Sequence, residues 1–197
     1  NNYKYKELIK WYKKPINSLL KKTINDQISI LKKHILGNNV LFIGLSDFSK
    51  KFTSSKNMSF ISIDEITSSD YITESKRLPF EDNSHDVIII LHALDYTDNP
   101  YELVREIDRI ATDDAKVAAI GFNKFSLWGI LKPFINKPSP PWILNFHSLY
   151  SVKEWFKLLG YEQNYKETAR FSPIFSKTFS KYLNKISFIQ KILARDF

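Results

Sequence analysis

The sequence predicts an α/β fold in which a mostly parallel central sheet is flanked by helices. Two observations predict this class. Short, almost wholly apolar runs recur between residues 40 and 120, and helical patterns separate them or flank them. Such runs are typical of strands that are buried on both faces, and their alternation with helices is typical of parallel sheets. The 197 residues, 43% of them hydrophobic, suffice for a single folded domain.

Residues 1–36, which precede the first predicted strand, are predicted to form a helical segment that covers the sheet. Apolar side chains recur at three-and-four spacing from Ile16 to Ile35, as in an amphipathic helix, and Gly37 is placed to end it. The members of this stripe are Ile16, Leu19, Leu20, Ile24, Ile28, Leu31 and Ile35. The leading segment also carries nine lysines against two acidic residues.

Four apolar runs after Gly37 are predicted strands, at residues 40–43, 60–63, 86–91 and 116–120. A helix is expected from Pro100, because proline suits the first helical position and apolar residues then recur on one face. Its inward-facing side chains are predicted to be Leu103, Ile107 and Ile110.

Residues 122–141 are predicted to be a loop that forms a lid over one end of the sheet, because four prolines fall between Pro133 and Pro141. A helix is expected over 151–160, with Ser151 as its N-cap and Gly160 at its end. A last strand is expected over 189–194.

Ligands of open parallel sheets bind beyond the carboxyl ends of the strands, so candidate site residues follow the predicted strands. An acidic residue that ends the second strand, Asp64 or Glu65, suits hydrogen bonds to ribose hydroxyls. The turn at Gly44 has one glycine and matches neither GxGxxG nor GxxxxGK[ST]. NAD and ATP are therefore not indicated as ligands.

Several motifs in a fixed order carry a resemblance to a known family. They are LPFEDNSHDV at 78–87, LHAL at 91–94, DNPYELVREIDRI at 98–110 and a strand that ends in Gly121. The chain resembles the class I S-adenosylmethionine-dependent methyltransferases of the type-11 group. GFNKFSLWG at 121–129 is similar to a segment of an uncharacterised bacterial branch of that group, the YafS-like proteins. The resemblance implies a Rossmann-like methyltransferase fold that uses S-adenosylmethionine and releases S-adenosylhomocysteine.

The resemblance also assigns cofactor-binding residues by position. The implied set is Gly44, Leu45 and Ser46 in the first loop, Asp64 or Glu65 at the ribose, Glu74 and Ser75 beside the adenine, and Leu91 and His92 near the methionine moiety. This chain departs from the family in its first loop, where Leu45 and Ser46 replace glycines that let the backbone approach the cofactor. The sequence leaves both binding and loss of binding open.

Methyl transfer depends mostly on holding the activated methyl group in line with the acceptor, so no catalytic residue is obligatory. If the acceptor must lose a proton, His92 is the candidate general base, with a packing role at the strand end as the alternative. The acceptor-side candidates are Tyr96, Asn123, Ser126 and Trp128, of which Asn123, Ser126 and Trp128 share one irregular segment. The other histidines, His34, His85 and His147, show no metal-ligand spacing, and no metal is assigned.

The function expected from the sequence is an S-adenosylmethionine-dependent methyltransferase of unknown acceptor. The alternative is a catalytically silent protein of the same fold that acts as an interaction module. Basic segments at 1–36 and 132–197 flank an acidic centre, which suits a phosphate-rich partner such as nucleic acid or anionic lipid, or simply solvated faces.

A single domain is expected, with a cofactor-binding half at 37–121 and a lid and substrate-side half at 122–197. The longest apolar run, residues 87–91, is far shorter than the roughly 20 residues of a membrane helix. The expected location is therefore the cytoplasm, without a membrane span. The absence of cysteine excludes disulfide scaffolds and thiolate metal sites.

Overall fold

A computed structural model of the protein describes residues 2–34, 37–45, 48, 57–61, 77–170 and 187–195. Six strands form one sheet, in the order β2-β1-β3-β4-β6-β5. The strands are β1 (Asn39–Gly44), β2 (Asn57–Ile61), β3 (His85–Leu91), β4 (Ala111–Gly121), β5 (Tyr161–Arg170) and β6 (Ser187–Arg195). The described helices are α1 (Asn2–Lys13), η1 (Pro15–Asn17), α2 (Ser18–His34), α5 (Ala93–Tyr96), α6 (Pro100–Ile110), α7 (Leu127–Leu131), η4 (Lys132–Phe134) and α8 (Leu149–Lys157).

The sheet is mostly parallel, which confirms the predicted class. β1 pairs in parallel with β2 and β3, and β3 pairs in parallel with β4. Only β6 runs against its neighbours, β4 and β5. In the register of the central strands, Gly44 lies beside Leu91 and Leu91 lies beside Ile120. The carboxyl ends of β1, β3 and β4 are therefore level and form one edge.

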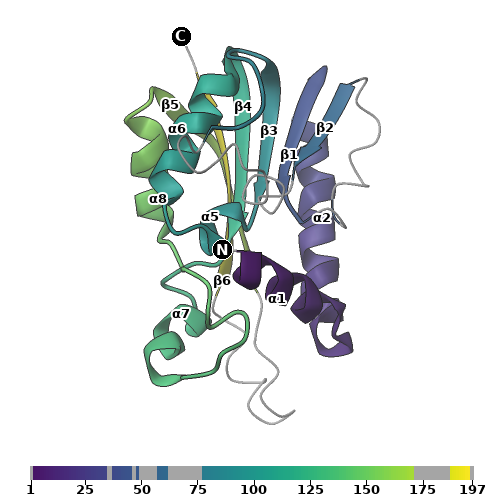
Figure 1. Ribbon diagram of the computed structural model, residues 1–197, viewed down its shortest axis with the longest axis vertical. Coiled ribbons are helices and arrows are strands. Elements are labelled where there is room, and N and C mark those ends of the chain that lie inside the picture. The colour runs from purple at the N-terminus through teal and green to yellow at the C-terminus, as the bar shows by residue number, and fades with distance from the viewer. Residues whose placement is uncertain are drawn as a thin grey trace.

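Helices cover both faces of this sheet and its carboxyl edge. Figure 1 shows α2 on one side of the strands and α6 and α8 on the other. The helix α1 lies across the end where β3 passes into α5, and α7 lies at the same end. Most of the core is formed by the inner faces of these helices and by β1, β3 and β4, whose central residues are almost wholly buried.

The predicted helical cover at residues 1–36 contains two helices, α1 and α2, and the amphipathic pattern that begins at Ile16 lies mostly in α2. The buried stripe of α2 is as predicted, since four of its apolar residues are fully buried: Leu20, Ile24, Ile28 and Leu31. The predicted inward positions of Ile16 and Leu19 are wrong, because these side chains are 60% and 55% exposed. Pro15 begins a 3-10 turn that separates α1 from α2, and Leu19 precedes the stripe by one residue, about 100° around the helix. Ile35 lies outside the described residues.

The later elements also differ in detail from the predictions. The helix α8 begins at Leu149, and its N-cap is Ser148, whose hydroxyl accepts from the Ser151 amide at 2.9 Å. Ser148 and Ser151 offer equivalent caps three residues apart, so sequence alone could not choose between them. The expected loop at 122–141 contains the short helix α7, and β5 had no predicted counterpart. The predicted last strand is confirmed by β6.

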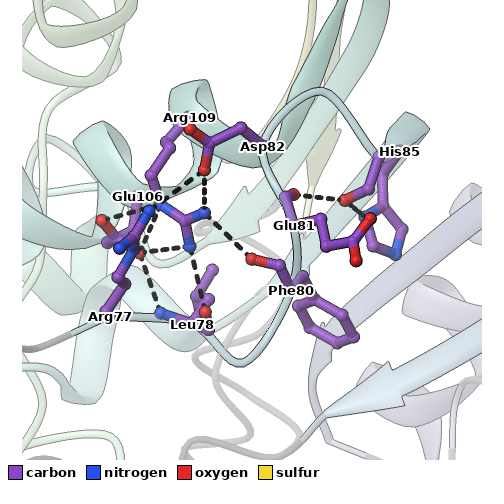
Figure 2. Close-up of polar contacts among 9 residues, drawn as sticks. Arg77, Leu78, Phe80, Glu81, Asp82, His85, Glu106 and Arg109 are labelled. Carbon is purple, nitrogen blue, oxygen red and sulfur yellow. Dashed lines mark hydrogen bonds and ion pairs between the residues drawn. The ribbon is translucent and has the colours of Figure 1, made fainter.

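The segment before β3 is held by one arginine of α6 (Figure 2). Arg109 donates to the carbonyl oxygens of Leu78 (3.0 Å) and Phe80 (2.9 Å) and pairs with Glu106 and Asp82. Glu106 in turn accepts from the Leu78 amide at 2.8 Å. The guanidinium also lowers the pKa of Asp82 through their hydrogen bond. This network lies at the start of β3. The residues of the motif at 78–87 that take part in it therefore attach the chain to α6 and do not lie at the carboxyl edge.

We expect Arg109→Ala to lower the free energy of unfolding by about 2 to 3 kcal/mol, because it removes the donor to the carbonyl groups of Leu78 and Phe80 and the cationic partner of Glu106. Denaturant unfolding followed by circular dichroism would measure the change. Arg105→Ala is the matched control, since Arg105 lies one turn earlier on α6 and is exposed. Equal losses for the two variants would contradict the structural role of Arg109.

Candidate functional site

The end of β1 turns sharply next to the end of β3. Gly44 has φ +133°, and a Cβ atom at this position would lie 2.1 Å from the carbonyl oxygen of Leu91. Only glycine fits this conformation and this close approach. Leu45, which follows, is buried, as is Phe48. The chain therefore leaves β1 in close contact with Leu91 at the end of β3.

His92 follows β3 in an unusual backbone conformation. Its φ of 58° and ψ of 2° lie in the left-handed region, which few residues other than glycine adopt. Its amide donates to the carbonyl oxygen of Ile120 at 2.8 Å, and its side chain is fully buried. Buried residues in such conformations persist only where their surroundings hold them, and they cluster at functional sites.

Both ring nitrogens of His92 have a partner. Nδ1 lies 2.7 Å from a carboxylate oxygen of Asp95, and Nε2 lies 2.7 Å from the hydroxyl of Tyr12 on α1. Because a carboxylate only accepts, Nδ1 carries the proton, and Nε2 accepts from the tyrosine. Burial, and secondarily the charge of Asp95, raise the pKa of Tyr12 well above its usual range. The Tyr12 hydroxyl is therefore protonated at neutral pH and can donate.

Asp95 connects three parts of the carboxyl edge. Besides His92, the same carboxylate oxygen accepts from the amide of Phe122 at 3.0 Å, just after β4. The Asp95 carbonyl oxygen accepts from the Asn145 amide at 2.6 Å. Asp95 itself is 1% exposed. The chain Tyr12–His92–Asp95 thus joins α1, the end of β3 and the end of β4 in one buried network.

Aromatic rings surround this network on the α1 side. Tyr12 packs edge-on against Phe48, with ring centroids 5.4 Å apart. Phe122 stacks on His92 at 4.6 Å and lies 5.7 Å from Trp128. Trp11 contacts both Phe122 and Trp128, at 6.2 and 5.9 Å. We call Trp11, Tyr12, Phe48, Phe122 and Trp128 the aromatic cluster.

The structure brings together part of the predicted site. Gly44, Leu45, Leu91, His92 and Tyr96 lie at or beside the carboxyl edge, and four of them are almost wholly buried. The other predicted cofactor residues, which are Ser46, Asp64, Glu65, Glu74 and Ser75, lie outside the described residues.

The three predicted acceptor-side residues of the segment after β4 serve local structure. The Asn123 side chain accepts from the Phe125 amide at 3.1 Å, and the Ser126 hydroxyl caps α7 by accepting from the Gly129 amide at 3.1 Å. Trp128, half-buried, belongs to the aromatic cluster. The ring of Trp128 thus packs against Phe122, which stacks on His92, while the two polar side chains stabilise the turn that precedes and begins α7.

A small cavity of about 40 Å³ lies on the other side of Asp95, between the end of β4 and α8. Asp95, Gly121, Asn123 and His147 are among its lining residues. His147 binds the carbonyl oxygen of Leu94 at 2.9 Å and packs on Trp155. Within the described parts of the chain, no group of three or more histidine or acidic side chains is placed to hold a metal ion.

Sequence reasoning missed four members of the aromatic cluster, Trp11, Tyr12, Phe48 and Phe122. Tyr12 lies 80 residues before His92, and nothing in the local pattern of α1 links it to β3. The basic, aromatic character of the first helix was the only signal available. Asp95 follows the predicted strand at 86–91, in the region where ligand-binding residues are expected, but its bond to the Phe122 amide, 27 residues further on, depends on the tertiary fold.

Comparison with known proteins identifies the fold. Residues 45–119 match the family described as "Methyltransferase domain". The chain is 37% identical over 87 residues to the uncharacterized protein YafS of Escherichia coli (strain K12). That match covers 43% of this chain and 36% of YafS, so it spans about a third of the relative's length. The resemblance inferred from the sequence motifs is thereby confirmed.

Solved structures agree over almost the whole chain. A possible histamine N-methyltransferase from Thermotoga maritima, described as SAM-dependent, has a TM-score of 0.69 at 12% identity and covers 99% of this chain and 98% of its own. A putative methyltransferase in complex with the Haloferax volcanii activator Trm112 has a TM-score of 0.61 at 11% identity, with 98% of each chain covered. The chain therefore has the Rossmann-like class I methyltransferase fold. No helix of the described parts is long and apolar enough to span a membrane.

Proposed function

We propose that the protein is an S-adenosylmethionine-dependent methyltransferase that acts on an unidentified acceptor at the carboxyl edge of β1, β3 and β4. One observation carries the proposal. In a sheet of methyltransferase topology, the turn at Gly44 lies against Leu91, next to a strained and fully buried His92. Strand ends of this kind are where open parallel sheets bind ligands.

The described residues fit the cofactor in their chemistry. The electron-rich faces of the aromatic cluster favour a cationic sulfonium over a neutral group. The turn at Gly44, which has no side chain, brings main-chain groups to the strand ends. The ribose and adenine would need polar partners, which we assign to residues after β2, outside the described part.

The residue roles that we propose are those that the family resemblance implies. We assign Gly44, Leu45 and Ser46 to the first cofactor loop and Leu91 and His92 to the methionine end. The ribose is assigned to Asp64 or Glu65 and the adenine side to Glu74 and Ser75. On the acceptor side we place Tyr96, Asn123, Ser126 and Trp128. In the same scheme residues 37–121 form the cofactor half, and residues 122–197 form the lid and acceptor half.

The bound cofactor would supply an activated methyl group, whose bond to sulfur breaks as the acceptor's lone pair attacks in line, leaving S-adenosylhomocysteine. The protein's part is to hold the two reactants and to exclude water. His92 would take the acceptor's proton on Nε2. Because Tyr12 occupies that nitrogen, the acceptor must first displace the tyrosine hydroxyl. The helix α1 would therefore shift when the acceptor binds.

Titration calorimetry with S-adenosylmethionine and S-adenosylhomocysteine tests the cofactor assignment. We expect binding in the micromolar range. The Asp64→Ala variant should weaken it about 10- to 100-fold, because hydrogen bonds from ribose hydroxyls to a charged group are lost. If Glu65 is the ribose partner instead, Glu65→Ala shows that loss.

Glu81→Ala is the matched control, because Glu81 is an exposed acidic residue of the segment that enters β3, at the opposite end of the sheet. The affinity of the Glu81→Ala variant for the cofactor should equal that of the wild type. If neither S-adenosylmethionine nor S-adenosylhomocysteine binds to a protein shown to be folded, the proposed enzymatic function is wrong. The alternative is then a catalytically silent protein of the methyltransferase fold that serves as an interaction module.

A further inference from the structure

Large apolar side chains are exposed at the same end of the molecule as the site. Among the described residues, eight such side chains are exposed, and six belong to α1, to the corner between α1 and α2, or to the segment 125–134. These six are Tyr3, Ile16, Leu19, Phe125, Ile130 and Phe134, with exposed fractions between 55% and 83%. Exposed apolar groups that gather on one surface mark an interaction site.

These residues belong to neighbouring elements at one end of the molecule, because α1 and the segment after β4 are in contact. The Tyr3 hydroxyl reaches the carbonyl oxygen of Pro138 at 3.5 Å, and the rings of Trp11 and Trp128 lie 5.9 Å apart. Figure 1 shows α1, the corner that follows it and α7 together at the carboxyl end of the strands. We call α1, the corner at residues 14–19 and the segment 124–138 the carboxyl-end surface.

The same surface is basic. No acidic residue occurs between Asp114 and Glu154, so the whole segment after β4 carries only positive charge. The exposed lysines of the carboxyl-end surface lie among its exposed apolar side chains. They are Lys6, Lys10, Lys13, Lys14, Lys124 and Lys137. The two acidic side chains at α1, Glu7 and Asp98, are each paired with one of its lysines, at 2.8 and 2.9 Å.

We infer that the carboxyl-end surface docks onto an anionic lipid bilayer. Lysines interspersed with exposed Phe, Ile and Leu are the composition with which peripheral proteins bind the headgroup and upper acyl region. The charges attract anionic headgroups, and the apolar side chains enter the interface. This proposal is independent of methyl transfer, since it rests only on the surface residues.

The exposed side chains favour lipid over nucleic acid. Nucleic-acid surfaces combine lysine or arginine with aromatic rings on which bases stack. Here Ile16, Leu19 and Ile130 have no flat ring to offer, and they lie exposed beside the lysines. Burial in an acyl layer gives such side chains a favourable contact that a polynucleotide does not.

Vesicle flotation with the full chain tests the inference. The probes are vesicles of phosphatidylcholine alone and of phosphatidylcholine mixed with phosphatidylglycerol. We expect binding to the anionic vesicles that weakens with added salt, and little binding to the neutral ones. The double variant Ile130→Ser, Phe134→Ser should bind at least about tenfold more weakly, and Lys13→Gln with Lys14→Gln about fivefold more weakly for each lysine.

Tyr150→Ser with Leu158→Ser is the matched control, because these two exposed apolar residues lie on or directly after α8, outside the carboxyl-end surface. Binding of this variant should equal that of the wild type. The proposal is overturned by absence of binding to anionic vesicles at low salt or by tighter binding to single-stranded DNA than to vesicles. It is also overturned if the Ile130/Phe134 variant and the Tyr150/Leu158 control lose vesicle binding equally. Cofactor titration of the Ile130/Phe134 variant shows separately whether the site is intact.

Discussion

Replacing Asp95 with alanine is expected to lower the free energy of unfolding by about 2 to 4 kcal/mol. The change removes the shared acceptor of the His92 Nδ1–H and the Phe122 N–H, both inside the protein. Each buried donor that loses its partner costs about 1 to 3 kcal/mol, partly offset because a buried carboxylate is removed as well. Urea unfolding monitored by circular dichroism measures the difference.

Asp98→Ala is the control for this change. Asp98 lies three residues further on, has a 65% exposed side chain and pairs with Lys4. Exposed ion pairs contribute about 0.2 to 1 kcal/mol, so its loss should be small. Asp95→Asn should fall between the two, since the amide oxygen can still accept from Phe122. A loss for Asp95→Ala no larger than that for Asp98→Ala would contradict the buried network.

Replacing His92 with glutamine is expected to slow methyl transfer about 100-fold. A general base contributes about 10²- to 10⁴-fold to the rate of such a step. Transfer of labelled methyl groups from S-adenosylmethionine to acceptors in a cell extract provides the rate. Because His92 is also assigned to the methionine end of the cofactor, some cofactor affinity should be lost as well. This loss should be smaller than the loss of rate, since the proton is taken only during transfer.

Tyr12→Phe separates this role from a structural one. The phenylalanine keeps the ring that packs on Phe48 but releases Nε2 of His92. If His92 is the base, this variant keeps the rate of the wild type or exceeds it, whereas the glutamine variant loses it. If His92 only holds the end of β3, the two variants lose rate alike, and the assignment of the base is wrong.

The main elements of the fold could be predicted because they depend on local patterns. The apolar run that became β3 and the amphipathic spacing of α6 each carry their own signal, and burial of Ile107 and Ile110 follows from it. Where two local solutions compete, prediction failed: Ser148 and Ser151 both suit an N-cap. Leu19 was wrongly included in the buried stripe of α2, because it precedes Leu20 by one residue and therefore points about 100° away around the helix.

The sequence by itself determined the class of the protein: an α/β domain with methyltransferase motifs, strand-end site residues and basic ends. Only the tertiary structure decided that Tyr12 meets His92, and that Asp95 joins the ends of β3 and β4. It also decided that α1 and the segment 124–138 share one basic, apolar surface. The physical reason is range. Turns, caps and periodicity arise among residues close in the chain. The bonds of Phe122 with Asp95, of Tyr12 with His92 and of Tyr3 with Pro138 instead join residues 27, 80 and 135 positions apart, which come together only when the sheet forms.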